Sequence, residues 1–113
     1  MTGVQTCALP IYQLRKGTTR LAVLHALERG PLYAYGLRRT TWEKTAGIFD
    51  FNEGVLYTLL HGLERDRLVR SSVRTIGGRK RRYYRLTTRG RETLTHCRRE
   101  WVALNKALDA ILD

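Results

Sequence analysis

Four consecutive basic residues, Arg79 to Arg82, follow the glycine pair Gly77-Gly78 and precede two tyrosines. The segment from Glu64 to Arg91 holds eleven Lys or Arg and two acidic residues, so it carries +9 of the chain's net charge of +11. A field concentrated in this way suits a polyanion, most economically nucleic acid. A merely solubilising surface is the alternative, but arginine far outnumbers lysine here, and arginine is suited to recognising phosphate.

A helix predicted over Glu53–Arg67 presents a second set of candidate contacts. Its four leucines, Leu56 to Leu63, recur at i, i+3, i+4 and i+7 and form one apolar stripe, and Asn52 before it suits an N-cap. The opposite face can meet bases and phosphates, because an α-helix fits the DNA major groove. The candidate DNA-contacting residues are Gly54, Val55, Tyr57, Thr58, His61 and Arg65. A solvated helix face would look similar, and the neighbouring +9 segment favours DNA.

The sequence contains no arrangement that indicates catalysis or metal binding. Its three histidines and two cysteines share no ligand spacing, and Gly77-Gly78 lacks the strand-to-helix context of a phosphate-binding loop. We therefore expect no enzyme activity, no metal and no cofactor. The cysteine usage, the lack of a signal peptide and the lack of an apolar run of ~20 residues favour a cytoplasmic protein without a membrane span.

The elements that must position these residues follow the order helix, helix, helix, hairpin, helix. Helical periodicity predicts a first helix over Leu14–Arg29, which Gly30-Pro31 ends. After a short extended entry, a poorly amphipathic second helix is expected over Leu37–Thr45. The loop over Ala46–Asn52 carries two aromatic residues that we expect to fill the core. Thr87 or Thr88 can cap a final helix that runs to the end of the chain.

Two β-like runs joined by the glycine pair predict a hairpin before that final helix. Leu86 is a core residue by type, and alternation places Tyr84 inward with it and Tyr83 outward. A register slip by one residue would exchange these roles. The basic residues expected at the hairpin tip, where they can reach phosphates or the minor groove, are Arg79, Lys80, Arg81 and Arg82. A charged edge that resists aggregation is the alternative.

The order and the sequences of these elements resemble one family. LRKGTTRLAVLHALERGPLYAYGL (Leu14–Leu37), NEGVLYTLLHGLERDRLV (Asn52–Val69) and GGRKRRYYRLTTRGRE (Gly77–Glu92) are similar to PadR-type transcriptional regulators, in particular the small members with one C-terminal helix. The resemblance implies a mainly α fold with a small β-hairpin, in which residues 12–87 form a winged helix-turn-helix and residues 88–113 a dimerisation helix. It also implies a homodimeric repressor that binds palindromic DNA. In such proteins the positions of Tyr57 and of the hairpin residues Arg79–Arg82, called the wing, commonly approach the DNA.

The chain departs from the usual pattern of that family in its second helix and after its third. Ala34 and Arg67 stand where the family usually has glycine, Gly36 where it has an acidic residue, and Arg38 and Thr41 where it has apolar residues. Arg67 stands at the C-terminal end of the third predicted helix, where left-handed backbone is favoured. A non-glycine residue in that conformation costs up to ~1 kcal/mol of stability. We expect loose packing of the second helix and an effect on stability more than on fold.

The final helix carries an apolar stripe with steps of three and four, an a/d pattern without a break. Its members are Leu94, Cys97, Trp101, Leu104, Leu108 and Ile111. A winged helix has little core surface left to cover this stripe, so we expect a homodimer seam rather than packing onto the chain's own core. Cys97 is expected as a small buried hydrophobe, with redox sensing as a minor alternative.

Trp101 lies in the middle of this seam and is a candidate ligand contact. Some members of the resembled family bind planar aromatic compounds at such an interface, and plain packing is the alternative role. The leading hypothesis is thus a sequence-specific repressor that binds double-stranded DNA. Its repression would be relieved by a small molecule that changes the spacing of the two DNA-contacting helices (Glu53–Arg67), one in each subunit, which we call the reading heads. A basic RNA-binding or ribosome-associated module and a protein-interaction adaptor with an acidic partner are the competing hypotheses.

The first residues are set apart from these arguments. TGVQTCALPI, Thr2–Ile11, resembles the translation of a short-read sequencing adapter. We therefore treat residues 1–11 as an artefactual leader, with a genuine leader peptide as the alternative. Cys7 takes no part in the expected chemistry in either case.

Overall fold

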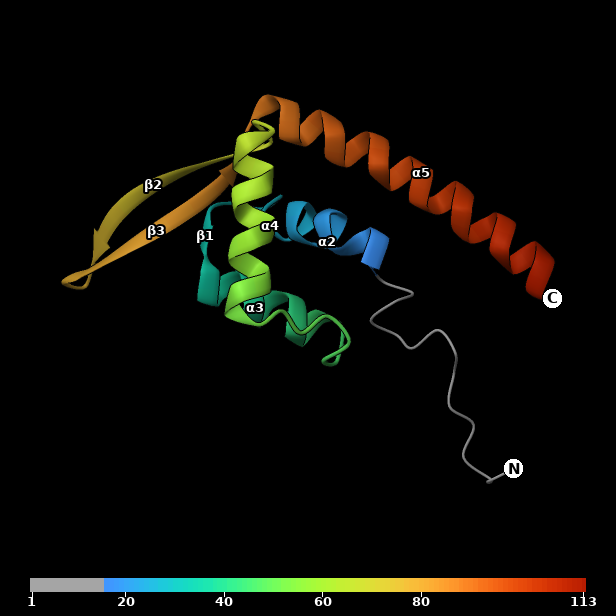
Figure 1. Ribbon diagram of the computed structural model, residues 1–113, viewed down its shortest axis with the longest axis horizontal. Coiled ribbons are helices and arrows are strands. Elements are labelled where there is room, and N and C mark those ends of the chain that lie inside the picture. The colour runs from blue at the N-terminus through green and yellow to red at the C-terminus, as the bar shows by residue number, and fades with distance from the viewer. Residues whose placement is uncertain (1–15) are drawn as a thin grey trace, which may run out of the picture.

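The structure is a computed structural model that describes residues 16–113 (Figure 1). The leader over residues 1–11, Cys7 and the expected helix start at Leu14 lie outside these residues. The elements are η1 (Lys16–Thr18), α2 (Thr19–Ala26), β1 (Leu32–Tyr33), α3 (Ala34–Lys44), α4 (Glu53–Arg65), β2 (Val69–Ile76), β3 (Arg79–Leu86) and α5 (Thr88–Leu112). The predicted order and the mainly helical class with a small sheet are confirmed.

The helix bounds differ from the prediction around the first two helices. α2 ends at Ala26 instead of Arg29, and α3 begins at Ala34 instead of Leu37. Between them, β1 pairs with β3, so the sheet has a third strand that the sequence did not reveal. A strand of two residues is too short to show any alternation, so only its partner strand exposes it.

The sheet is antiparallel with the order β1-β3-β2, and β2 and β3 form the long hairpin in Figure 1. Gly77 and Gly78 have φ angles of 60° and 79°, as a two-residue hairpin turn requires when both central residues are left-handed. The register pairs Ile76 with Arg79 at the turn and Val69 with Leu86 at the base. This register gives β3 the expected alternation, because Tyr84 and Leu86 are 2 % and 4 % exposed.

The hydrophobic core lies where α2, α3, α4, the hairpin base and the start of α5 meet. Its buried side chains are Val23, Leu24, Leu27, Leu37, Phe51, Leu56, Leu60, Leu63, Leu68, Val69, Tyr84, Leu86 and Leu94. Phe51 is buried and Phe49 packs against the same cluster, so the loop before α4 fills the core as predicted. Leu59 completes the leucine stripe of α4 at the edge of this core.

The two polar residues of α3 that stand in apolar positions are accommodated by hydrogen bonds. Thr41 is buried, and its hydroxyl donates to the carbonyl of Leu37 at 3.0 Å. Arg38 donates to the Asp50 carboxylate at 3.3 Å and keeps its guanidinium at the surface. Burial of a hydroxyl costs little once it is bonded, so neither residue disrupts α3.

One backbone junction ties the end of α4, the start of β2 and the start of α5 together. Arg67 has φ 63°, so the predicted left-handed position after α4 is confirmed. The Thr87 hydroxyl donates to the Arg67 carbonyl at 2.7 Å and accepts from the Gly90 amide at 2.9 Å, and the Thr87 amide donates to the Leu68 carbonyl at 3.1 Å. Gly90 packs directly on the Leu68 carbonyl, where a Cβ atom would overlap the oxygen.

Gly90→Ala should destabilise the protein by about 1–3 kcal/mol, because the first turn of α5 must move away from Leu68 to admit the methyl group. Urea unfolding followed by circular dichroism at one protein concentration measures this change. Gly62→Ala, in an open position of α4, is the matched control and should stabilise the helix by about 0.5–1 kcal/mol. Equal stability of the two variants would contradict the close contact.

Candidate nucleic-acid interface

α4 is held so that one face is buried and the opposite face is open. Asn52 accepts the Val55 amide at 2.9 Å through its side chain, which fixes the helix start as predicted. The leucine stripe packs into the core, and Val55 and Tyr57 remain 46 % and 43 % exposed. The other predicted contacts on this helix are also exposed: Gly54, Thr58, His61 and Arg65.

The N-terminal turns of this face are small and polar. The Thr58 hydroxyl donates to the Gly54 carbonyl at 2.9 Å, which leaves its oxygen lone pairs for an incoming donor. A Cβ atom at Gly54 would meet nothing closer than the Asn52 side-chain oxygen at 3.6 Å, an ordinary contact. The fold itself therefore does not require glycine at this position, and an exposed glycine here leaves the helix backbone open to close approach by a partner.

The hairpin divides its basic residues between two faces. Arg79 and Lys80 flank the turn, whereas Arg81 and Arg82 pair with Arg74 and Val73 along the strands. The expectation that all four occupy the tip is therefore wrong, because β3 is regular from Arg79 onward and its side chains alternate. Lys80 and Arg82 share a face with buried Tyr84, and Arg79 and Arg81 lie on the outer face.

The face that includes Arg82 is connected to α4 by a short hydrogen-bond chain. Arg82 donates to the Ser71 hydroxyl at 3.1 Å, and that hydroxyl donates to the Glu64 carboxylate at 2.7 Å. Tyr84 anchors the same face, and burial, with a smaller contribution from Glu64, raises the pKa of its phenol. The wing is thus fixed to the helix by both packing and polar contacts.

The outer face carries aromatic contacts that sequence reasoning missed. The Arg81 guanidinium lies 4.4 Å from the ring centroid of Tyr33, and the Tyr33 and Tyr83 rings meet edge to face at 5.5 Å. Arg74 lies 5.3 Å from the Tyr83 ring centroid. Tyr83 is consequently half-buried rather than exposed, because β1 brings Tyr33 beside it. The extended segment that starts at Leu32 was the only sequence signal for this partner.

The residues predicted for the dimer seam differ in burial, and the change from buried to exposed occurs at Cys97. Leu94 is 2 % exposed and belongs to the core of its own chain, and Cys97 is half-buried. Trp101 and the stripe beyond it are exposed along α5, which extends away from the core in Figure 1. The exposed fractions are 41 % for Trp101, 54 % for Leu104, 44 % for Leu108 and 77 % for Ile111.

Comparison with known proteins agrees with this geometry. Residues 23–96 match the family model described as the transcriptional regulator PadR-like family. The chain belongs to the PadR-like family of transcriptional regulators. PadR-like regulators bind DNA, so the open face of α4 and the hairpin are the elements to consider for that contact. In the part of the chain that the structure describes, no group of His, Cys, Asp and Glu could hold a metal, and no helix is long and apolar enough to cross a membrane.

Individual relatives and solved structures match most of the chain. It is 36 % identical over 87 residues to the transcriptional regulator Rv3488 of Mycobacterium tuberculosis, which is 77 % of this chain and 78 % of that protein. A PadR family transcriptional regulator from Eggerthella lenta superposes with a TM-score of 0.80 at 29 % identity, covering 91 % of this chain and 88 % of the other. A Streptococcus transcriptional regulator gives 0.78 at 31 % identity, covering 89 % and 98 %.

Gly54→Ala should leave the PadR-like fold intact and weaken binding to an operator, because a methyl group then stands between the α4 backbone and the DNA. We expect a loss of about ten-fold or more, equivalent to about 1.4 kcal/mol. The operator is selected from a random duplex library by the wild-type protein, and affinity is measured by fluorescence anisotropy. Gly62→Ala, further along the helix, should keep wild-type affinity. An equal effect of both substitutions would contradict the assignment of Gly54.

Proposed function

We propose that this chain is a sequence-specific homodimeric repressor that acts in the cytoplasm and is relieved by a small-molecule effector. The observation that carries the proposal is the exposed small and polar N-terminal half of α4 next to a basic hairpin that is fixed to the same helix. α4 would enter the major groove, and Arg79 and Lys80 at the hairpin tip would contact phosphates or the minor groove.

Dimerisation is supported by the exposed apolar stripe of α5. Trp101, Leu104, Leu108 and Ile111 are between 41 % and 77 % exposed, an arrangement that is unfavourable for a helix surrounded by water. Packing on a second copy through a two-fold axis would cover it and would present two reading heads. Half-sites about one helical turn, ~34 Å, apart in a palindromic operator follow from this symmetry.

Effector binding is supported by the surroundings of Trp101. The indole lines a groove of about 510 Å³ between the first helical segment and α5, together with Leu21, Leu24, Cys97 and Leu104. An apolar groove of this size with an aromatic side chain suits a flat aromatic compound. Because α2 and α5 form its walls, a bound compound could change the angle between the reading head and the dimerisation helix.

The double variant Arg79→Ala, Lys80→Ala should weaken binding to every duplex and lower the salt slope by about 1–2, since each lost phosphate contact removes about 0.9 from the slope of log K against log salt. Anisotropy titrations between low and moderate salt measure the slope. Arg29→Gln with Lys44→Gln removes the same charge outside the hairpin and should leave the salt slope unchanged.

The same titrations separate the competing functions. Single-stranded RNA that competes as well as the selected duplex would favour an RNA-binding module. Weak duplex binding even at low salt would favour a protein-interaction adaptor.

Leu104→Asp with Leu108→Asp should yield a monomer and abolish operator binding, because charges would replace the centre of the apolar stripe. Analytical ultracentrifugation gives the mass, and circular dichroism reports whether the winged domain stays folded. A dimeric variant would contradict the seam.

Planar phenolics and dyes should quench the emission of Trp101 if they bind in its groove. The measurement uses the Trp42→Phe variant, in which Trp101 is the one remaining tryptophan. Emission unchanged by every compound of the panel would contradict the effector site.

A further inference from the structure

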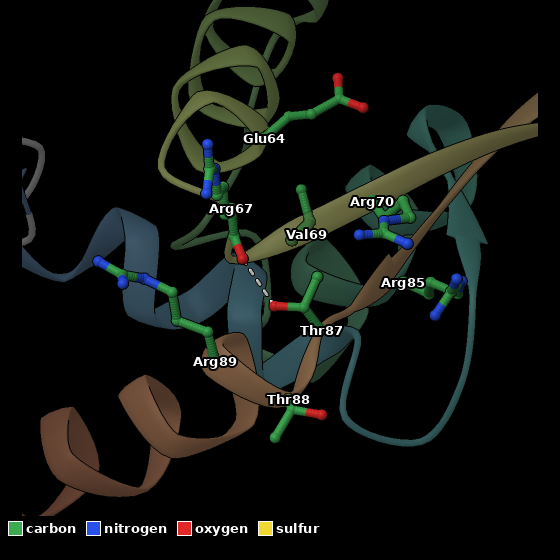
Figure 2. Close-up of a pocket in the computed structure, with 8 residues that line it drawn as sticks. All are labelled: Glu64, Arg67, Val69, Arg70, Arg85, Thr87, Thr88 and Arg89. Atoms are coloured by element: carbon green, nitrogen blue, oxygen red, sulfur yellow. Dashed lines mark hydrogen bonds between the residues drawn. The ribbon is translucent and has the colours of Figure 1, made fainter.

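A second basic surface lies at the base of the hairpin, away from its tip. Here α4, β2, β3 and α5 enclose a groove of about 720 Å³ (Figure 2). The charged residues that line it are four arginines, Arg67, Arg70, Arg85 and Arg89, and one acid, Glu64. Figure 2 shows Arg70 and Arg85 side by side on one wall, and Arg67 and Arg89 on the opposite side.

The side chains of the four arginines in this groove have no partner in the described part of the chain. Among residues 16–113, none of them forms an ion pair or a side-chain hydrogen bond, and the Glu64 carboxylate accepts from Ser71 at 2.7 Å instead. Four arginines outside the groove do form ion pairs with carboxylates: Arg20, Arg38, Arg39 and Arg98. The groove therefore concentrates positive charge that the protein leaves uncompensated.

Two of these arginines are placed directly opposite each other in the sheet. Arg70 pairs with Arg85 across β2 and β3, and like charges in such a position repel. A second like-charge pair, Arg74 and Arg81, is compensated because the two guanidinium groups lie over the Tyr83 and Tyr33 rings. No such ring contact occurs at Arg70 or Arg85 within the described chain, so only solvent screens their repulsion and a bound anion would relieve it further.

One backbone feature of the groove also favours an anion. Thr88 and Arg89 form the first turn of α5, where amide groups lack acceptors within the helix and the helix dipole is positive.

The groove lies apart from the N-terminal half of α4 and from the hairpin tip, although Arg65, the last predicted DNA contact of α4, is its neighbour in the chain. The groove is at the C-terminal end of α4, and the 13-residue helix places its N-terminal end ~20 Å away. The eight-residue strands place the hairpin tip ~26 Å away. Phosphates held by the N-terminal turns of α4 and by the tip would not occupy this groove.

We propose that the groove binds a small compound with a chain of phosphate groups, such as a tripolyphosphate or a nucleoside triphosphate. Its volume lies in the range of small-molecule sites, and guanidinium groups form paired hydrogen bonds with phosphate oxygens. The ligand touches the end of the reading helix, both strands of the wing and the start of α5. Its occupancy therefore stabilises one angle between the reading head and the dimerisation helix. The site goes beyond the repressor function and does not depend on it.

Isothermal titration calorimetry of the full chain with sodium tripolyphosphate, at constant ionic strength and without DNA, tests the proposal. We expect one ligand per chain and a loss of about ten-fold or more in affinity for Arg70→Gln with Arg85→Gln. Two control variants should retain the wild-type affinity for tripolyphosphate. Arg29→Gln with Lys44→Gln removes an equal charge elsewhere on the surface. Arg79→Ala with Lys80→Ala removes the two basic side chains at the hairpin tip. The groove variant should melt no lower than wild type, because a repulsive pair is removed.

ATP in place of tripolyphosphate identifies the source of the phosphates. Tighter binding of ATP supports a nucleotide, and equal affinity supports an inorganic polyphosphate. No binding to the wild type, or equal weakening in either control, overturns the proposal. It is also overturned if a selected operator duplex displaces tripolyphosphate and the groove variant lowers the DNA salt slope, since the groove is then a DNA backbone contact.

Discussion

The contact between the first turn of α5 and the Leu68 carbonyl is the contact on which the rest of the molecule depends. Gly90 lets the helix backbone reach that carbonyl, and Thr87 bonds to the carbonyl of Arg67 and the amide of Gly90. Polar backbone groups removed from water need such partners, so the junction can close in few ways. Because α4 ends, β2 begins and α5 begins there, this junction sets the direction of the hairpin and of α5 relative to α4.

Beyond this junction, the hairpin carries its buried residues at its base and its exposed basic residues toward its tip. Tyr84 and Leu86 fasten one face to the core, while the tip is free to carry Arg79 and Lys80. The outer face gains order from β1, which supplies Tyr33 to both Tyr83 and Arg81. Cation–π contacts let Arg74 and Arg81 lie opposite each other on neighbouring strands, which explains how the sheet tolerates this like-charge pair near the middle of the hairpin. At the base, the pair of Arg70 and Arg85 lacks that compensation.

The small core explains why the stripe of α5 matters. Leu94 is the last residue of that helix to be buried within the chain, and the apolar side chains after it lie in the open. A domain of this size buries a modest share of its surface, so covering the stripe with a second copy would add stability as well as symmetry. Two grooves border this junction: the apolar groove at Trp101, which Leu68 also lines, and the basic groove at Arg70, which Arg67 and Val69 also line.

Periodicity and residue type in the sequence determined the order of elements, the leucine stripe of α4, its Asn52 cap, the Gly77-Gly78 turn, the burial of Tyr84 and the left-handed backbone at Arg67. These are local properties, because each depends on neighbours along the chain. Only the tertiary structure decided that Tyr83 is half-buried, that Leu94 belongs to the core and that four arginines line one groove. Those outcomes depend on β1 meeting β3 and on α5 meeting Leu68, contacts between residues far apart in sequence that no local pattern encodes.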